Sequence, residues 1–175
     1  MLETPEETAE QQELLDRSHA GSTEHLRGII GPKVTLRAVD IAALMTGMKV
    51  LSVATVTARG EPRISALDGH FLHATWTFTT SGTAAKAQHL ARRPAVSIAH
   101  VDNEELALFA HGQVQTLQPG EPFWDETLDH WTAHYGSSPL SWGEDIRVYR
   151  FRPQWMVGYC ANPDKLMRER GITPP

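Results

Sequence analysis

Residues 77–101 read TFTTSGTAAKAQHLARRPAVSIAHV, and this stretch decides the fold class. Just before and at its start, residues 75–80 carry Thr and aromatic side chains, which are typical of a strand. Residues 84–93 are mostly strong helix formers and end at a proline, so we expect a short helix there. Residues 96–101 return to strand-type sequence. The stretch therefore predicts a strand, a helix and a second strand, with the hydroxyl-rich turn Ser81-Gly82-Thr83 before the helix.

A β-hairpin is predicted upstream of this stretch. Residues 49–57 alternate with the period of a strand, residues 59–62 supply turn chemistry, and residues 63–72 resume strand-type sequence. Asp68-Gly69 would ordinarily be a two-residue turn. We expect the strand to continue through it and to turn at His73-Ala74, because the next strand needs a long partner.

Three more strands and a helix are predicted downstream. Residues 106–117 form a strand in which Gly112 indicates a bulge or a close backbone approach. A helix follows at 122–134, and two final strands, 145–151 and 154–159, are separated at Arg152-Pro153. Strands with a short helix between the third and the fourth, and no repeated βαβ units, favour a mainly β fold, a small closed barrel with helices at its ends.

The N-terminal region is expected to lie outside this barrel. Residues 1–12 are rich in Glu, Gln and Thr and predict a loosely ordered tail. A short helix is expected at 13–26, and another from about Asp40 to Met48 behind an Asp cap. We divide the chain into 1–30, a tail with a short helix, and 31–175, the barrel domain.

Composition excludes several classes of protein. The 175 residues suffice for one domain with a sizeable core, and the net charge of −5 without a basic stripe argues against a nucleic-acid partner. The single cysteine excludes an internal disulfide framework and favours a reducing compartment. Neither a secretory signal nor an apolar run of about 20 residues is present, so we expect a cytoplasmic protein without a membrane partner.

The turn between the strand and the helix is suited to an anion. Hydroxyls of residues 79–83 and the free amides at the start of the helix can face one point, and Lys86 can reach back to it. Arg63 on the neighbouring strand can add a second cation, which suits a phosphate monoester. The alternative is that Thr83 simply caps the helix and Lys86 is solvated.

Three segments together resemble a known family. They are LSVATVTARGEPRIS at 51–65, the opening stretch at 77–101 and FAHGQV at 109–114, with IRVYRFRPQWMVGY at 146–159 as a looser extension. They resemble the pyridoxamine 5′-phosphate oxidase-related family of flavin-binding proteins. The resemblance implies a six-stranded antiparallel split β-barrel that forms a homodimer, with two cofactors in the grooves between the subunits.

The resemblance also implies which residues hold the cofactor. Its phosphate or ribityl chain would contact Arg63, Ser65, Thr80, Ser81 and Lys86, with Thr79 and Thr83 as further contacts, and Gln113 and Trp142 would come from the partner subunit. The implied cofactor is FMN or, as the alternative, the 8-hydroxy-5-deazaflavin coenzyme. Haem is an unfavoured third choice.

The function implied is that of a flavin-dependent oxidoreductase acting on a small organic molecule. The cofactor would carry the chemistry, so no catalytic side chain is required. A non-catalytic protein that binds or stores a flavin, a deazaflavin or haem is the alternative. The family's oxidases end in an Arg-x-His pattern that grips their substrate, whereas this chain has Tyr149 two residues after Arg147. Oxidation of pyridoxamine or pyridoxine 5′-phosphate is therefore not expected.

Histidines, tryptophans and the cysteine are expected to be structural. His130 and His134 share a helix face, but Trp131 stands where a zinc protease motif has Glu, so no metal site is expected. His100 and His111 are expected to face each other across the sheet. Cys160 is expected to be a small buried hydrophobe. Large aromatic side chains, Trp131 among them, are expected in the core or at the dimer interface.

Overall fold

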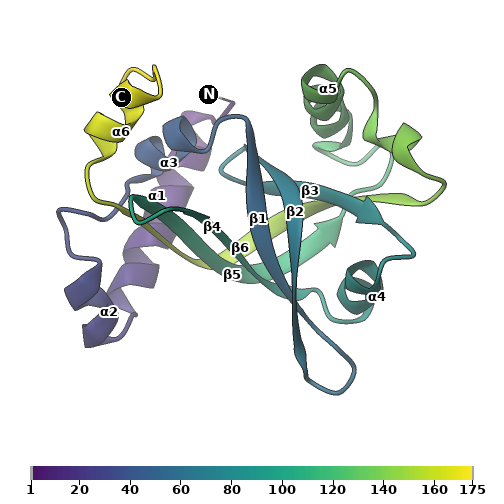
Figure 1. Cartoon of the computed structure of the whole chain (residues 1–175), viewed down its shortest axis with the longest axis horizontal. Helices are drawn as coiled ribbons and strands as arrows, with labels where there is room; N and C mark the ends of the chain where they lie inside the picture. Colours follow the sequence, from purple (N-terminus) through teal and green to yellow (C-terminus); the bar gives the residue numbers. More distant parts are fainter. Residues whose placement is uncertain (1, 175) are drawn as a thin grey trace.

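The computed structural model describes residues 2–174, in which the alternating segments form six antiparallel strands that close into one barrel (Figure 1). The strands pair in the order β1-β2-β3-β6-β5-β4. Their bounds are β1 Met48–Val56, β2 Pro62–Leu72, β3 Thr75–Ser81, β4 Ala95–Asp102, β5 Leu106–Thr116 and β6 Ile146–Cys160. The predicted fold class, a six-stranded antiparallel barrel, is confirmed.

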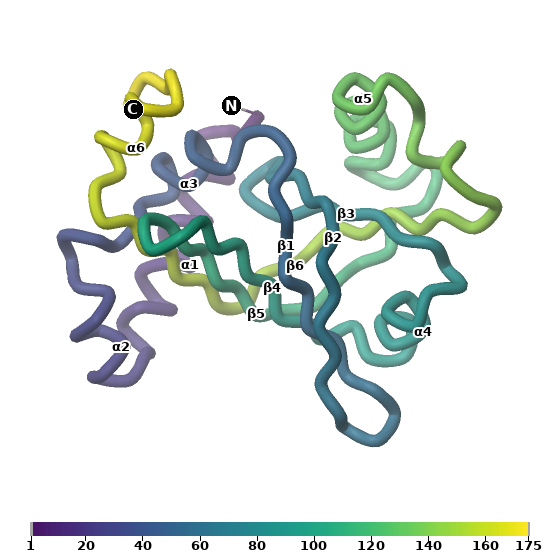
Figure 2. The backbone as a smooth tube through the Cα atoms, viewed as in Figure 1, coloured from purple at the N-terminus to yellow at the C-terminus, as the bar shows by residue number. Residues whose placement is uncertain are grey.

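The first hairpin follows the prediction closely. β2 runs through Asp68-Gly69, and the chain turns at His73-Ala74, where both residues have positive φ (52° and 59°). Two positive φ angles are what a two-residue hairpin turn requires. Gly69 is needed inside β2 because a Cβ there would collide with the side chain of Leu51 on β1. The β1–β2 hairpin extends beyond the rest of the barrel at the bottom of Figure 2.

The last strand differs from the prediction. Residues 145–151 and 154–159 were expected as two strands, but β6 is one strand, which pairs with β3 at its start and with β5 from Tyr149 to Cys160. A register shift between His111 and Gly112 admits the extra residue beside Pro153, which has no N–H to give to the ladder. The predicted bulge and close approach at Gly112 are confirmed, since a Cβ on Gly112 would collide with the carbonyl oxygen of Arg152.

The N-terminal segment is helical rather than a loose tail. Helix α1 spans Pro5–Ala20, and a capping box between Thr4 and Glu7 starts it. The helix packs on β6, where the hydroxyl of Ser18 accepts a hydrogen bond from the amide of Met156 at 3.0 Å. Long-range packing of this kind stabilises a helix whose own sequence is mostly polar, which is why the expectation for residues 1–12 was wrong.

The other helices surround the barrel. They are α2 Glu24–Ile29, α3 Ala38–Leu44, α4 Ala85–Arg92, α5 Trp124–Tyr135, the 3-10 turn η1 Pro139–Trp142 and α6 Pro163–Glu169. Helix α3 starts two residues before Asp40, which is its third residue and part of the cap with Arg37, and it ends before Met48. Helices α4 and α5 lie where they were predicted. No helix in residues 2–174 has the length and apolar character needed to cross a membrane.

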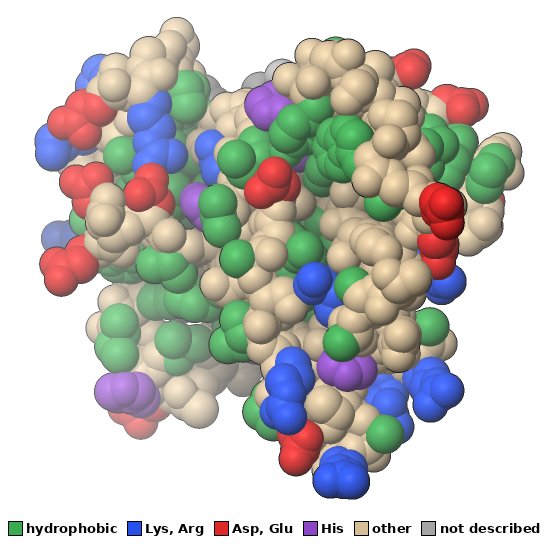
Figure 3. Space-filling view, turned by 45° about the vertical axis from the view of Figure 1, so that its right-hand side comes forward, with side chains coloured by type: hydrophobic (Ala, Val, Ile, Leu, Met, Phe, Trp, Pro, Cys, Tyr) green, Lys and Arg blue, Asp and Glu red, His purple; other side chains and the backbone are tan. Residues whose placement is uncertain are grey.

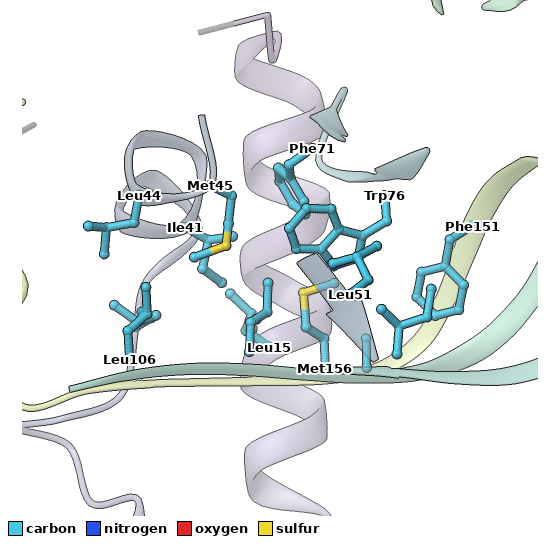
Figure 4. Packing of buried hydrophobic residues seen from close by; sticks show 14 of the residues in the cluster. Leu15, Ile41, Leu44, Met45, Leu51, Phe71, Trp76, Leu106, Phe151 and Met156 are labelled. Atoms are coloured by element: carbon cyan, nitrogen blue, oxygen red, sulfur yellow. The ribbon is translucent and has the colours of Figure 1, made fainter. Parts of the chain in front are cut away.

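The core lies inside the barrel and continues to the helices α1 and α3. Figure 4 shows Leu15 of α1 and Met45, directly after α3, close to Met156 and the aromatic pair Phe71 and Trp76. The rings of that pair meet edge to face at 5.0 Å between centroids. One end of the barrel is thus filled by α1 and α3, while α4 covers the other end, beside the lower part of β1 (Figure 1).

Candidate functional site

A gap in the strand pairing lies beside α4. β2 and β3 pair from Leu72–Thr75 only as far as Gly69–Phe78, after which β3 continues against β6 and β2 against β1. Beyond that point Arg63 and Ser65 occupy the same face of β2 as Phe71, and Thr80 the same face as Phe78. These three predicted site residues therefore belong to the inward faces of two diverging strands.

The start of α4 offers unpaired backbone donors. Its N-cap is Ala84, not Thr83 as predicted, and no side chain caps it. Within residues 2–174 the amides of Ala85, Lys86 and Ala87 have no hydrogen-bond acceptor. Three free amides in the first turn of a helix, at the positive end of its dipole, form a site for an anion.

The turn before the helix is held by its own hydroxyls. Ser81 Oγ lies 2.8 Å from Thr83 Oγ1 and accepts the amide of Thr83 at 3.2 Å. Ser81 and Thr83 thus shape the turn as well as offering oxygens to a ligand. Thr79 lies on the opposite face of β3 from Thr80, across from Val148 of β6, so the structure does not bring Thr79 to the same point.

Cations gather at this end of the molecule. Figure 3 shows several basic side chains around a histidine over the hairpin tip and α4. Lys86 has no carboxylate partner among the salt bridges of residues 2–174. Arg63 is paired with Glu61 at 2.9 Å, and both side chains are about half exposed. The strand neighbour of Arg63, Thr55, contacts His89 of α4 at 3.0 Å, which places Arg63 one strand away from the helix.

Two residues missed by the sequence analysis adjoin the turn. Asp145 and Arg147, paired at 3.3 Å, lie against Gly82, and the amide of Gly82 donates to the carbonyl oxygen of Asp145 at 2.6 Å. A side chain at position 82 would collide with Asp145. The only signal in the sequence is the glycine itself, since the pairing of β3 with β6 joins residues more than 60 positions apart.

Gln113 and Trp142 lie away from this point in the single chain. Gln113 is exposed on β5 opposite Arg152, and Trp142 is 44 % exposed in η1, where its ring packs on Tyr135 at 5.0 Å. Neither residue contacts Lys86. Their assignment to a site completed by the partner subunit stays a prediction.

The histidines differ from expectation in one pair. His100 is buried and its Nδ1 lies 3.0 Å from the carbonyl oxygen of Val50, whereas His111 is exposed and stacks on Trp155, so the two do not face each other. The strand register explains this. His111 lies opposite Ser97 and His100 lies opposite Leu108, and because 97 and 100 differ by an odd number, the two histidines point to opposite faces of the sheet.

A second group of histidines lies under α5. His130 Nε2 is 3.0 Å from Nδ1 of the buried His70, and the ring of His134 is 4.8 Å from that of His70. Burial, followed by the neighbouring His130, His134 and Lys49, lowers the pKa of His70 to about 3. Within residues 2–174 no group of three or more His, Cys, Asp or Glu side chains has the arrangement of a metal site.

Two further predictions concern residues of β6. Cys160 is buried, as expected, and burial raises the pKa of its thiol. Tyr149 is enclosed in the core, where its ring stacks on Phe78 at 5.3 Å. In sequence, Tyr149 stands where the family's oxidases have the His of their Arg-x-His pattern. In the structure, however, a side chain at position 149 points into the core and not toward a ligand.

The comparisons with known proteins agree with this geometry. Among solved structures, the haem storage protein HutZ of Vibrio cholerae is 23% identical, with a TM-score of 0.55 over 62% of this chain and 84% of that one. An F420 reductase is 21% identical (TM-score 0.53, 66% of this chain, 94% of that one). A FAD-binding protein of Mesorhizobium loti is 19% identical (TM-score 0.56, 71% and 93%).

At these identities the structures show a shared fold. No curated protein sequence matches the chain. The family model described as pyridoxamine 5′-phosphate oxidase matches residues 40–160, which covers every strand of the barrel and α4. The predicted resemblance is confirmed: the chain belongs to the pyridoxamine 5′-phosphate oxidase family.

Proposed function

We propose that this protein binds a phosphorylated flavin-type cofactor, FMN or the 8-hydroxy-5-deazaflavin coenzyme, with the phosphate at the start of α4. The observation that carries the proposal is the set of three free amides at Ala85–Ala87 beside the unpaired ammonium of Lys86. Thr80, Ser81 and Thr83 add hydroxyls at the same turn. The oxygens of a phosphate can share hydrogen bonds from these donors, so the residues present fit the group.

The charge distribution supports the same assignment. The chain carries a net charge of −5, yet α4 and the hairpin tip contribute Arg59, Arg63, Lys86, Arg92 and Arg93 against Glu61. A phosphate monoester carries close to two negative charges at neutral pH. A cationic end on an otherwise acidic protein attracts such a group and orients it.

An exposed apolar face supports a homodimer. On the outer side of the barrel, Ala66, Ser52, Ala99 and Phe109 form one continuous row of cross-strand neighbours. The rows beside it add Val50 and Val101, each 56% exposed, and Ile64, 74% exposed. Apolar patches of this kind on a small protein mark an interaction surface. Gln113 shares this face with Phe109, which supports its contribution to the groove of the partner subunit.

The chemistry would belong to the bound cofactor, whose ring exchanges a hydride with a small organic substrate. The chain would hold the phosphate, fix the position of the ring and, through the second subunit, exclude water from it. No nucleophile or general base is needed for this function. The alternative is a protein that only binds the cofactor, because the phosphate site is the same in both cases.

Two measurements test this proposal. The absorbance spectrum of the purified protein distinguishes FMN, a deazaflavin and haem, and reduction by a nicotinamide donor coupled to turnover of an added acceptor distinguishes an enzyme from a binding protein. A protein that binds no flavin or deazaflavin at micromolar concentration would refute the cofactor assignment.

The dimer is tested by sedimentation, which should give twice the 19.4 kDa monomer mass, and Phe109→Glu should shift the measured mass toward that of the monomer. A monomeric wild-type protein with cofactor bound would contradict the dimer.

A further inference from the structure

A cavity of about 550 Å³ lies between α1, the β2–β3 turn and β6, away from the α4 site. Residues 7–17 of α1 form one wall, residues 73–75 and Phe123 form another, and residues 150–153 of β6 form the floor. A volume of this size lies within the range of small-molecule sites in proteins.

Two of the carboxylates and two of the arginines around this cavity have partners within residues 2–174. Glu7 contacts His73 at 3.0 Å, and Glu13 pairs with Arg17 at 3.9 Å. Arg152 donates from Nε to the side-chain oxygen of Gln115 at 2.9 Å. Of the three guanidinium groups that line the cavity, one has no carboxylate or amide side chain as a partner within residues 2–174.

That group is the guanidinium of Arg150. It lies over the ring of Phe123, 4.1 Å from the centroid, and its one hydrogen bond within residues 2–174 is a long one, 3.5 Å to the carbonyl oxygen of His73. It has no carboxylate partner there, and burial lowers its pKa. A guanidinium has five N–H donors in a planar fork, and leaving most of them unsatisfied in a half-buried place is costly.

We propose that this cavity binds a small organic carboxylate, with the carboxylate on Arg150 and a flat apolar body against Phe123. A carboxylate matches the fork of a guanidinium with two parallel hydrogen bonds. Leu14, Phe151 and Pro153 supply apolar lining for the rest of the ligand. The carboxylates of Glu7, Glu10 and Glu13 on the facing helix repel a dianion more strongly than a monoanion, so the site favours a monocarboxylate over a phosphate.

Benzoate is the probe that tests this site. Titration calorimetry on the cofactor-free dimer or monomer should show one benzoate per chain with a dissociation constant of about 1 mM or below. Benzyl alcohol, which has the ring without the charge, should bind at least 10-fold more weakly, and inorganic phosphate should not displace benzoate. Arg150→Gln should weaken benzoate binding by about 10- to 150-fold, whereas Arg168→Gln, an exposed arginine on α6, should leave it unchanged.

A second variant controls for the case in which Arg150→Gln fails to fold. Phe123→Leu keeps the charge of Arg150 and should weaken benzoate binding several-fold while the thermal midpoint stays near that of the wild type. Loss of the benzoate signal on adding FMN would mean that the probe occupies the cofactor site, and it would overturn the proposal. So would the absence of saturable binding at about 10 mM benzoate, or equal affinity in wild type and Arg150→Gln. Because the readout needs no cofactor, its failure is separate from failure of the function proposed above.

Discussion

The two ends of the barrel use their polar groups differently. At the α4 end, the first amides of the helix and the ammonium of Lys86 have no partner within residues 2–174. At the end formed by the β2–β3 turn, polar side chains are joined to one another, as in the pairs of His73 with Glu7 and with Glu126. Paired groups hold a structure together, and free groups are available to a ligand. Arg150 is the exception at the turn end, because most of its N–H donors have no partner within residues 2–174. Substitutions of the paired groups at the turn end should therefore change stability, and those at the α4 end should change binding.

The largest expected effect is on substrate choice. Pyridoxine 5′-phosphate carries a phosphate of its own, which needs cations beyond those that hold the cofactor. Arg147 is paired with Asp145 and Tyr149 is buried in the core, so this part of the chain does not supply them. We expect kcat/KM for pyridoxine or pyridoxamine 5′-phosphate to lie orders of magnitude below about 10⁴ M⁻¹s⁻¹ in FMN-loaded protein. Steady-state production of pyridoxal 5′-phosphate at or above that value would restore the vitamin-pathway activity.

Packing at the turn end should govern stability. Leu15 of α1 is 2% exposed and contacts the core beside Met156 (Figure 4). Leu15→Ala should lower the free energy of unfolding by about 2–5 kcal/mol through lost burial and the cavity it leaves. Urea unfolding measures this change. The exposed Leu140→Ala is the matched control and should cost much less; equal losses would show that α1 is not part of the folded core.

His70 should make the protein less stable in acid. Burial, with His130, His134 and Lys49 nearby, lowers its pKa to about 3 in the folded state, against about 6.5 in the unfolded state. Between these values the unfolded chain takes up a proton that the folded chain does not, so stability falls as pH drops below 6.5. The loss attributable to His70 is about 2–3 kcal/mol between pH 7 and 4.5. Urea unfolding at the two pH values should show a smaller difference in His70→Gln, and an unchanged difference would contradict the assignment.

His73, three residues further on, should have the opposite and smaller effect. Burial lowers its pKa, but the carboxylates of Glu126 and Glu7 outweigh this and raise it above the usual value. Its contribution is complete below the unfolded pKa and is lost as pH rises through the folded pKa. His73→Gln should therefore cost about 1 kcal/mol at pH 6 and less at pH 9. A cost that grows with pH, measured by thermal or urea unfolding, would reverse this reading.

How much of the molecule is predictable from the sequence depends on the range of the interactions. The turn at His73-Ala74, the helix after Thr83 and the bulge at Gly112 follow from local signals, and all three are present. The first half of helix α1 was missed, although a helix was expected from residue 13, because its polar sequence becomes stable through contacts of residues such as Ser18 with β6, more than 130 positions away.

The same distinction holds within the site. Lys86 and the hydroxyls of the turn are neighbours in sequence, so their positions at the end of β3 and the start of α4 were predictable. The contact of Asp145 and Arg147 with Gly82 depends on the pairing of β3 with β6, and the pairing of Arg63 with Glu61 depends on side-chain geometry at the hairpin tip. Local patterns do not contain this information.

The contrast between the two ends depends on the proposed phosphate site at the start of α4. The contribution of the phosphate to cofactor affinity can be measured directly. Affinities should be compared for FMN and riboflavin, and for the phosphorylated and unphosphorylated deazaflavin, on wild type, Lys86→Ala and the control Lys165→Ala on α6. We expect the phosphorylated form of the true cofactor to bind at least 10-fold more tightly than its unphosphorylated form. Lys86→Ala should weaken only the phosphorylated form, by about 10- to 150-fold, with stability unchanged. Equal binding of both forms in both series, or equal affinities in wild type and Lys86→Ala, would contradict the account.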